Sequence, residues 1–146
     1  MARVNRGVST VVGYVLNLGI ATILVTGLLV SGGGLVDDQR ERTARSQMDV
    51  IGNRIAADLE TADRLLRTGN GSVTVRSDLP PTVVGSQYQV DVVASNGTAI
   101  LRVETTRPSV IRTVPVRNVT PVQPVSITGG DLIIDGRNGS LEVTNG

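Results

Sequence analysis

The spacing of apolar residues divides the chain into three stretches. Thirty consecutive uncharged residues run from Gly7 to Val36, more than the roughly 20 that an α-helix needs to cross the hydrocarbon core of a bilayer. From Asp37 to Thr68 apolar residues recur every three or four positions, and after Gly71 they alternate with polar ones in short runs. We therefore expect an α+β protein: a long N-terminal helix, with a transmembrane part and an amphipathic continuation, followed by a small antiparallel β-sandwich or meander.

Charges on the two flanks of the apolar stretch predict its orientation. Arg3 and Arg6 precede it, and Asp37 and Asp38 follow it. Arg in excess on one side of a span favours the cytoplasm for that side. We expect a single-span protein of the cell membrane, with its N-terminus in the cytoplasm and its C-terminal domain outside the cell. A buried core helix and a cleaved secretory signal are the alternatives, and the length of the run disfavours both.

Small or polar residues recur every four positions along the apolar stretch. They are Ser9, Gly13, Asn17 and Ala21, and this spacing places them on one slowly drifting face of a helix. In lipid, small residues allow close helix–helix approach, and a buried amide is costly without a partner. We expect this stripe to pack against other helices, although glycine, serine and threonine are also common in single anchors.

The start of the chain carries a resemblance to a known family. The segment 6–13, RGVSTVVG, lies directly before the long apolar run and resembles the N-terminus of archaeal type IV pilin-like proteins, including the minor and haloarchaeal pilin-like families. The resemblance implies that a prepilin peptidase recognises Arg6 and Gly7 and cuts before Val8. The apolar helix then remains attached to the exported product. The resemblance also implies that this product can assemble into a surface filament.

Two positions depart from the family pattern. Thr10 stands where family members often carry Pro, and Asn17 is unusual for the spine of a filament-forming helix. These departures resemble a minor or pilin-like component more than a major subunit.

The expected organisation has four parts. They are a leader peptide, a transmembrane and assembly helix, an amphipathic helix and an extracellular β-domain, at residues 1–7, 8–36, 37–68 and 69–146. We expect Gly32, Gly33 and Gly34 to weaken or kink the helix, since each interior glycine costs about 1 kcal/mol relative to alanine.

The amphipathic helix has clear limits and one apolar stripe. Asp37 and Asp38 suit its start, and Gly69 is a usual terminator, so the helix should end at Thr68. Its stripe consists of Met48, Ile51, Ile55, Leu59, Ala62 and Leu66. The stripe is narrow enough for a coiled-coil seam, but we favour packing on the protein's own domain.

Seven short runs predict the strands of the β-domain. They span residues 72–76, 87–94, 98–105, 110–116, 122–128, 132–134 and 141–143. Asn96-Gly97 is a favoured two-residue hairpin turn and would pair Val92 with Leu101 and Asp91 with Arg102. The six prolines cannot donate to a ladder and should mark loops or edges.

A second hairpin is expected near the C-terminus. A four-residue loop, Gly136 to Gly139, would pair Ile134 with Leu141. We prefer it to a two-residue turn at Asn138-Gly139, because that turn would set Asp135 against Glu142.

The composition provides few residues that could take part in catalysis. The chain has no Cys, His, Trp or Phe, and its net charge is +1, so a disulfide framework, metal sites and nucleic-acid binding are disfavoured. Asp131 and Asp135 are carboxylates beside glycines at the ends of a predicted strand, where turn aspartates are ordinary. We expect no enzyme, catalytic residue, metal or cofactor.

Four Asn-x-Ser/Thr sequons lie in the predicted exported part. They begin at Asn70, Asn96, Asn118 and Asn138, whereas composition alone predicts roughly one or two. Three are Asn-Gly turns, so Asn118 is the cleanest candidate for N-glycosylation.

These features predict a structural subunit rather than a catalyst. Its expected partners are other pilin-like subunits, a prepilin peptidase and the membrane, with no nucleic acid and no small-molecule substrate. The alternative is a permanent single-span envelope protein whose β-domain binds a ligand or another protein.

Overall fold

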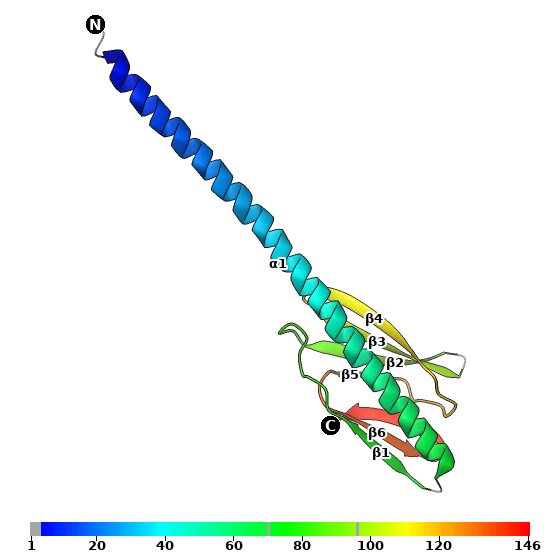
Figure 1. Cartoon of the computed structure of the whole chain (residues 1–146). Coiled ribbons are helices and arrows are strands. Elements are labelled where there is room, and N and C mark those ends of the chain that lie inside the picture. The colour runs from blue at the N-terminus through cyan, green and yellow to red at the C-terminus, as the bar shows by residue number, and fades with distance from the viewer. Residues whose placement is uncertain (1–3, 70, 96) are drawn as a thin grey trace. The chain divides into compact units, whose positions relative to one another are not determined.

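The computed structural model describes residues 4–69, 71–95 and 97–146, with side chains from residue 7 onward. One helix precedes seven strands, as expected for an α+β protein (Figure 1). Their bounds are α1 Val4–Thr68, β1 Val73–Ser77, β2 Tyr88–Ser95, β3 Thr98–Thr106, β4 Ser109–Val116, β5 Val125–Thr128, β6 Leu132–Arg137 and β7 Ser140–Asn145. The chain forms two compact units, Met1–Gln39 and Arg40–Gly146, and α1 contributes to both.

Helix α1 is continuous over its 65 residues. The three glycines at positions 32–34, where we expected the helix to weaken or kink, do not interrupt it. The backbone hydrogen bonds of a helix join residues of the helix itself. A glycine therefore lacks side-chain contacts but keeps its backbone hydrogen bond. The end at Thr68 is confirmed, with the N–H of Gly69 donating to the carbonyl of Leu65 at 2.9 Å.

The charged half of α1, residues 40–68, packs on its own domain, as predicted. Five residues of its apolar stripe are buried in the core and Leu66 packs against it. A Cβ at Gly52 would lie 2.8 Å from Val114 Cγ2 of β4, and one at Gly136 of β6 would lie 3.2 Å from Leu66. The helix therefore contacts both sheets.

The strands form two antiparallel sheets. Their orders are β1-β6-β7 and β4-β3-β2-β5, and each sheet has one buried and one exposed face. The predicted Asn96-Gly97 hairpin is confirmed, because Val92 pairs with Leu101 and Asp91 with Arg102. Pro115 lies in β4, an edge strand, where a missing donor is tolerated.

The second hairpin has a different register from the one we predicted. Ile134 pairs with Val143 rather than Leu141, and the turn is the two-residue Asn138-Gly139. Both turn residues have positive φ, 50° and 74°, which suits the twist of a type I′ hairpin. Asp135 does face Glu142, but it also accepts a 2.6 Å hydrogen bond from the hydroxyl of Thr74. This neighbour from β1 is what the local pairing argument omitted.

Candidate functional site

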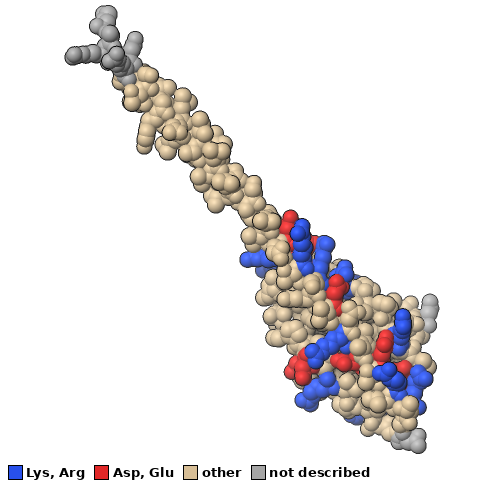
Figure 2. All heavy atoms as spheres, in the orientation of Figure 1, with Lys and Arg blue, Asp and Glu red and all other residues tan. Residues whose placement is uncertain are grey.

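The apolar segment of α1, residues 7–36, is long and apolar enough to cross a membrane. It lies near the N-terminus, and its most apolar 18-residue window has a mean hydropathy of 2.0 with none of its side chains buried inside the protein. Charged side chains crowd the surface of the other unit, as Figure 2 shows, and none occurs in the apolar segment. These properties fit a single-span membrane protein.

The predicted processing site lies in the first turns of α1. The helix begins at Val4, so the peptide bond between Gly7 and Val8 is helical, and both residues are exposed. The side chain of Arg6 lies outside the described part of the chain. No acidic residue occupies the first helical turn, so nothing there offsets the positive end of the helix dipole, which favours fraying around this bond.

The predicted packing stripe is exposed along its whole length. A Cβ placed on Gly13 would have no heavy atom within 4 Å. Asn17 and Ala21 line a shallow hollow of about 200 Å³ together with Tyr14 and Leu18, whereas Ser9 and Gly13 lie outside it. The hydroxyls of Thr22 and Thr26 each donate to a carbonyl of their own helix. Asn17 has no comparable bond among the described residues, which leaves its amide available to another helix.

The structure describes the asparagines of two of the four sequons, and these two differ in accessibility. Asn70 and Asn96 lie outside the described residues. Asn118 is half-buried: its Nδ2 atom, which would carry a glycan, donates to the carbonyls of Thr120 and Gly97, while its Oδ1 accepts from the N–H of Ala99. Asn138 is exposed in the β6–β7 turn. Asn138 therefore presents the accessible amide, and Asn118 presents one engaged in holding a loop.

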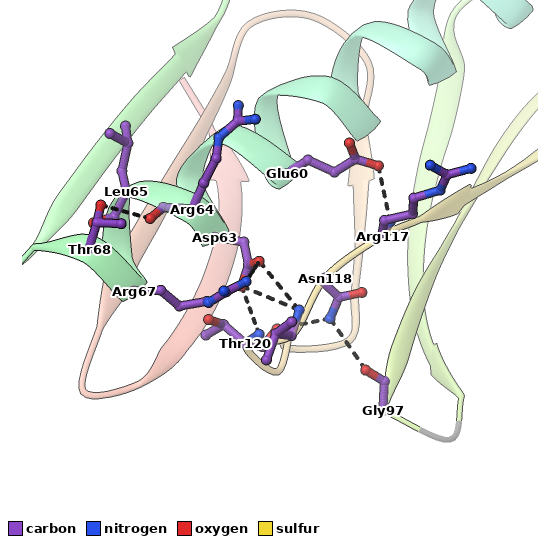
Figure 3. Close-up of polar contacts among 11 residues, drawn as sticks. Glu60, Asp63, Arg64, Leu65, Arg67, Thr68, Gly97, Arg117, Asn118 and Thr120 are labelled. Atoms are coloured by element: carbon purple, nitrogen blue, oxygen red, sulfur yellow. Dashed lines mark hydrogen bonds and ion pairs between the residues drawn. The ribbon is translucent and has the colours of Figure 1, made fainter.

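A buried carboxylate fixes the loop that follows β4. Asp63 is 4% exposed, and its Oδ1 accepts a 2.7 Å hydrogen bond from the N–H of Thr120, with the N–H of Val119 at 3.4 Å (Figure 3). Arg67 approaches the other oxygen at 3.5 Å. One turn earlier, Glu60 accepts from the N–H of Arg117 at 3.1 Å. Two helix carboxylates thus hold the backbone of residues 117–120.

The ionised form of Asp63 is favoured by this arrangement. Burial is the largest single influence and acts to raise its pKa. The hydroxyl and N–H of Thr120, the N–H of Val119 and the charge of Arg67 together outweigh it, so the pKa of Asp63 lies below its ordinary value of 3.8.

The two carboxylates singled out from the sequence have structural roles. Asp131 accepts a hydrogen bond from the N–H of Leu79 at 3.3 Å, and Asp135 binds the hydroxyl of Thr74. Each connects its own strand region to a neighbouring segment.

An apolar hollow lies beside the packed half of α1. It has a volume of about 300 Å³ and is lined chiefly by Val50, Ile51, Arg54, Leu79, Pro80 and Thr82. Val50 is 66% exposed, and it is an apolar residue on an otherwise polar helix face. The wall opposite the helix is the loop between β1 and β2.

Sequence reasoning missed Asp63 and this hollow. Asp63 directly follows Ala62 of the apolar stripe, and a carboxylate bordering a buried stripe is a usable sign of a specific partner. The hollow had no such sign, since Leu79 and Pro80 lie far from Val50 in the sequence.

Comparison with known proteins gave one match. A family model described as a family of unknown function (DUF7266) matches residues 3–144. No curated protein matches the chain, and no solved structure does.

Proposed function

The chain belongs to that family of unknown function over nearly its whole length, and we propose that it is a structural, type IV pilin-like subunit. Its apolar segment anchors it in the membrane and then packs against other subunits in a filament or envelope complex. The β-domain is displayed outside the cell.

The observation that carries the proposal is the contrast within α1. Large apolar side chains of the apolar segment are 50% to 73% exposed, so the protein itself provides no cover for them. Lipid or other helices must cover such a surface in the mature protein. The other half of the same helix is built into the core of the β-domain, where the sheets cover its apolar stripe.

The flanking charges support an orientation with the N-terminus inside. Arg3 and Arg6 lie before the span, and the aspartates follow it. In this orientation the bond between Gly7 and Val8 lies at the cytoplasmic end of the span, within reach of a membrane-embedded peptidase.

The alternative is a permanent single-span envelope protein whose β-domain binds a ligand. It differs from the proposal in the N-terminus of the mature chain, because a permanent anchor keeps residues 1–7 and a processed subunit lacks them. Mass spectrometry of the N-terminal peptide of protein purified from its own membranes separates the two.

We expect the mature chain to begin at Val8, since the resemblance places the cut there. Replacement of Arg6 by alanine or of Gly7 by valine should leave the leader attached, whereas Arg3→Ala, outside the recognition pair, should be processed normally. A wild-type chain that retains residues 1–7 would overturn the proposal.

A further inference from the structure

We propose that Asn138, in the turn between β6 and β7, is an N-glycosylation site of the folded protein, and that the fold closes Asn118 to the same modification. The donor is a saccharide whose anomeric carbon is linked through phosphate to a membrane lipid. The modification goes beyond the proposed function, because it requires only that the β-domain lies outside the cell. It therefore applies to a processed subunit and to a permanent anchor alike.

The residue that follows each Asn-Gly pair distinguishes a sequon from an ordinary turn. Asn-Gly by itself suits a tight hairpin turn, but the turn geometry concerns these two residues and not the next one. The pairs at Asn70, Asn96 and Asn138 are each followed by serine or threonine, although these two residue types make up only 25 of the 146 residues. The third position therefore indicates a use of these sequons beyond turn formation.

The β6–β7 turn presents its sequon to solvent. Asn138 is exposed, and its side chain has no hydrogen bond to any other described residue. A Cβ placed on Gly139 would have no heavy atom within 4 Å, so the space around the turn is open. The hydroxyl of Ser140 donates to the carbonyl of Arg137 at 3.3 Å, and this hydrogen bond is itself exposed. The amide and the hydroxyl that define the sequon are both within reach of an enzyme.

The sequon at Asn118 has the same chemistry in a closed setting. Nδ2 of Asn118 donates to the carbonyl of Thr120 at 2.8 Å and to that of Gly97 at 3.4 Å (Figure 3), and its Oδ1 accepts from the N–H of Ala99 at 2.8 Å. Thr120, which supplies the hydroxyl of this sequon, is 7% exposed, and its side chain is hydrogen-bonded to Asp63. A saccharide on Asn118 would have to displace contacts that hold this loop.

The attachment reaction explains why these differences matter. Nδ2 of the asparagine forms a bond to the anomeric carbon while the bond from that carbon to the phosphate oxygen breaks. The lipid phosphate leaves with the bonding electron pair, and one N–H proton passes to a base of the transferase. The reaction needs an Nδ2 with an unengaged N–H and room for a bulky group beside it. Asn138 meets both requirements, and Asn118 meets neither.

Peptide mass spectrometry of the full-length chain, purified from its own membranes, tests the assignment. A protease that cuts before aspartate releases Asn138 in the peptide 135–146 and Asn118 in the peptide 91–130. We expect a saccharide on Asn138 and none on Asn118, with fragment ions locating the modified residue. Asn138→Asp keeps a favoured Asp-Gly turn and should remove the saccharide completely.

Two further variants separate the sequon from its surroundings. Ser140→Ala keeps the asparagine and should also remove the saccharide, whereas Thr144→Ala removes a hydroxyl of the same peptide outside the sequon and should retain it. A bare wild-type peptide 135–146, a saccharide that survives Asn138→Asp, or a saccharide on Asn118 would overturn the assignment.

The N-terminal peptide of the same sample reports on the proposed function independently. A chain that begins at Val8 with a bare Asn138 would overturn the glycosylation site and leave the proposed function standing. A chain that carries the saccharide on Asn138 and retains residues 1–7 would support the site and overturn the proposed function.

Discussion

The two halves of α1 share one secondary structure and have opposite surroundings. Residues 7–36 are uncharged and exposed on every side, whereas residues 40–68 bury one stripe in a protein core and expose charges on the rest. The helical hydrogen bonds continue from one half to the other. The two regions therefore do not differ in their secondary structure.

The difference lies in what covers the apolar side chains. In the packed half the β-sheets cover them, so each side chain has neighbours of fixed shape. In the apolar segment the cover must come from outside the chain, and lipid or another helix tolerates changes of side-chain size more easily. The two halves should therefore respond very differently to the same substitution.

Truncating a leucine should give the largest difference between the halves. Leu59 is fully buried, so Leu59→Ala should lower the free energy of unfolding of the β-domain by about 2–5 kcal/mol, through lost burial and the cavity that remains. Leu24, 62% exposed, is the matched control, and Leu24→Ala should change that free energy by less than about 0.5 kcal/mol. Urea titration of the detergent-solubilised chain, followed by circular dichroism, measures both. Equal losses would contradict the division into a packed and an uncovered half.

Removing the charge of Asp63 should have a smaller effect. Asp63→Asn leaves one acceptor and turns an amide toward the N–H groups of Val119 and Thr120, so we expect a loss of about 1.5–3 kcal/mol, the range for hydrogen bonds to charged groups. Asp58→Asn, on the same helix and outside these hydrogen bonds, should be nearly neutral. An Asp63→Asn variant as stable as the wild type would show that the loop is held by other contacts.

The same residue predicts a pH dependence. Because the pKa of Asp63 is lower in the folded chain than its ordinary value of 3.8, its contribution is present above that value. It is lost as the pH falls through the lower folded pKa. The wild type should lose stability below pH 3.8 more steeply than Asp63→Asn in acid titrations followed by circular dichroism, and parallel curves would contradict this.

Adding a methyl group to a helical glycine should produce the smallest effect, and only in the packed half. A Cβ at Gly52 would lie 2.8 Å from Val114 Cγ2, a clash worth about 1–3 kcal/mol against a gain in helix propensity of about 1 kcal/mol. Gly52→Ala should therefore lower domain stability by about 1 kcal/mol. Gly27 has no heavy atom within 4 Å of its added Cβ, so Gly27→Ala should leave the domain unchanged in the same urea titration. Stabilisation by Gly52→Ala would show that Val114 moves aside freely.

The two hairpins show how far local sequence reasoning reaches. At Asn96-Gly97 the turn dipeptide, the alternation and the Asp91–Arg102 pair all favour one register, and that register is observed. At Asn138-Gly139 the turn chemistry favoured two residues while the Asp135–Glu142 pair opposed it, and we gave the charges more weight. The contact between Thr74 and Asp135 comes from a strand 61 residues away, so no local pattern could reveal it.

The order of elements, the end of α1 at Thr68 and the buried stripe could be read from the sequence, because hydrophobic periodicity and turn residues act over a few positions. The same holds for the long apolar segment, whose length alone meets the requirement of a bilayer. The division into two sheets, the carboxylate of Asp63 beneath Thr120 and the hollow beside Val50 were decided by tertiary structure. Each depends on contacts between segments that are far apart in the sequence. Such contacts produce no periodic pattern of residues.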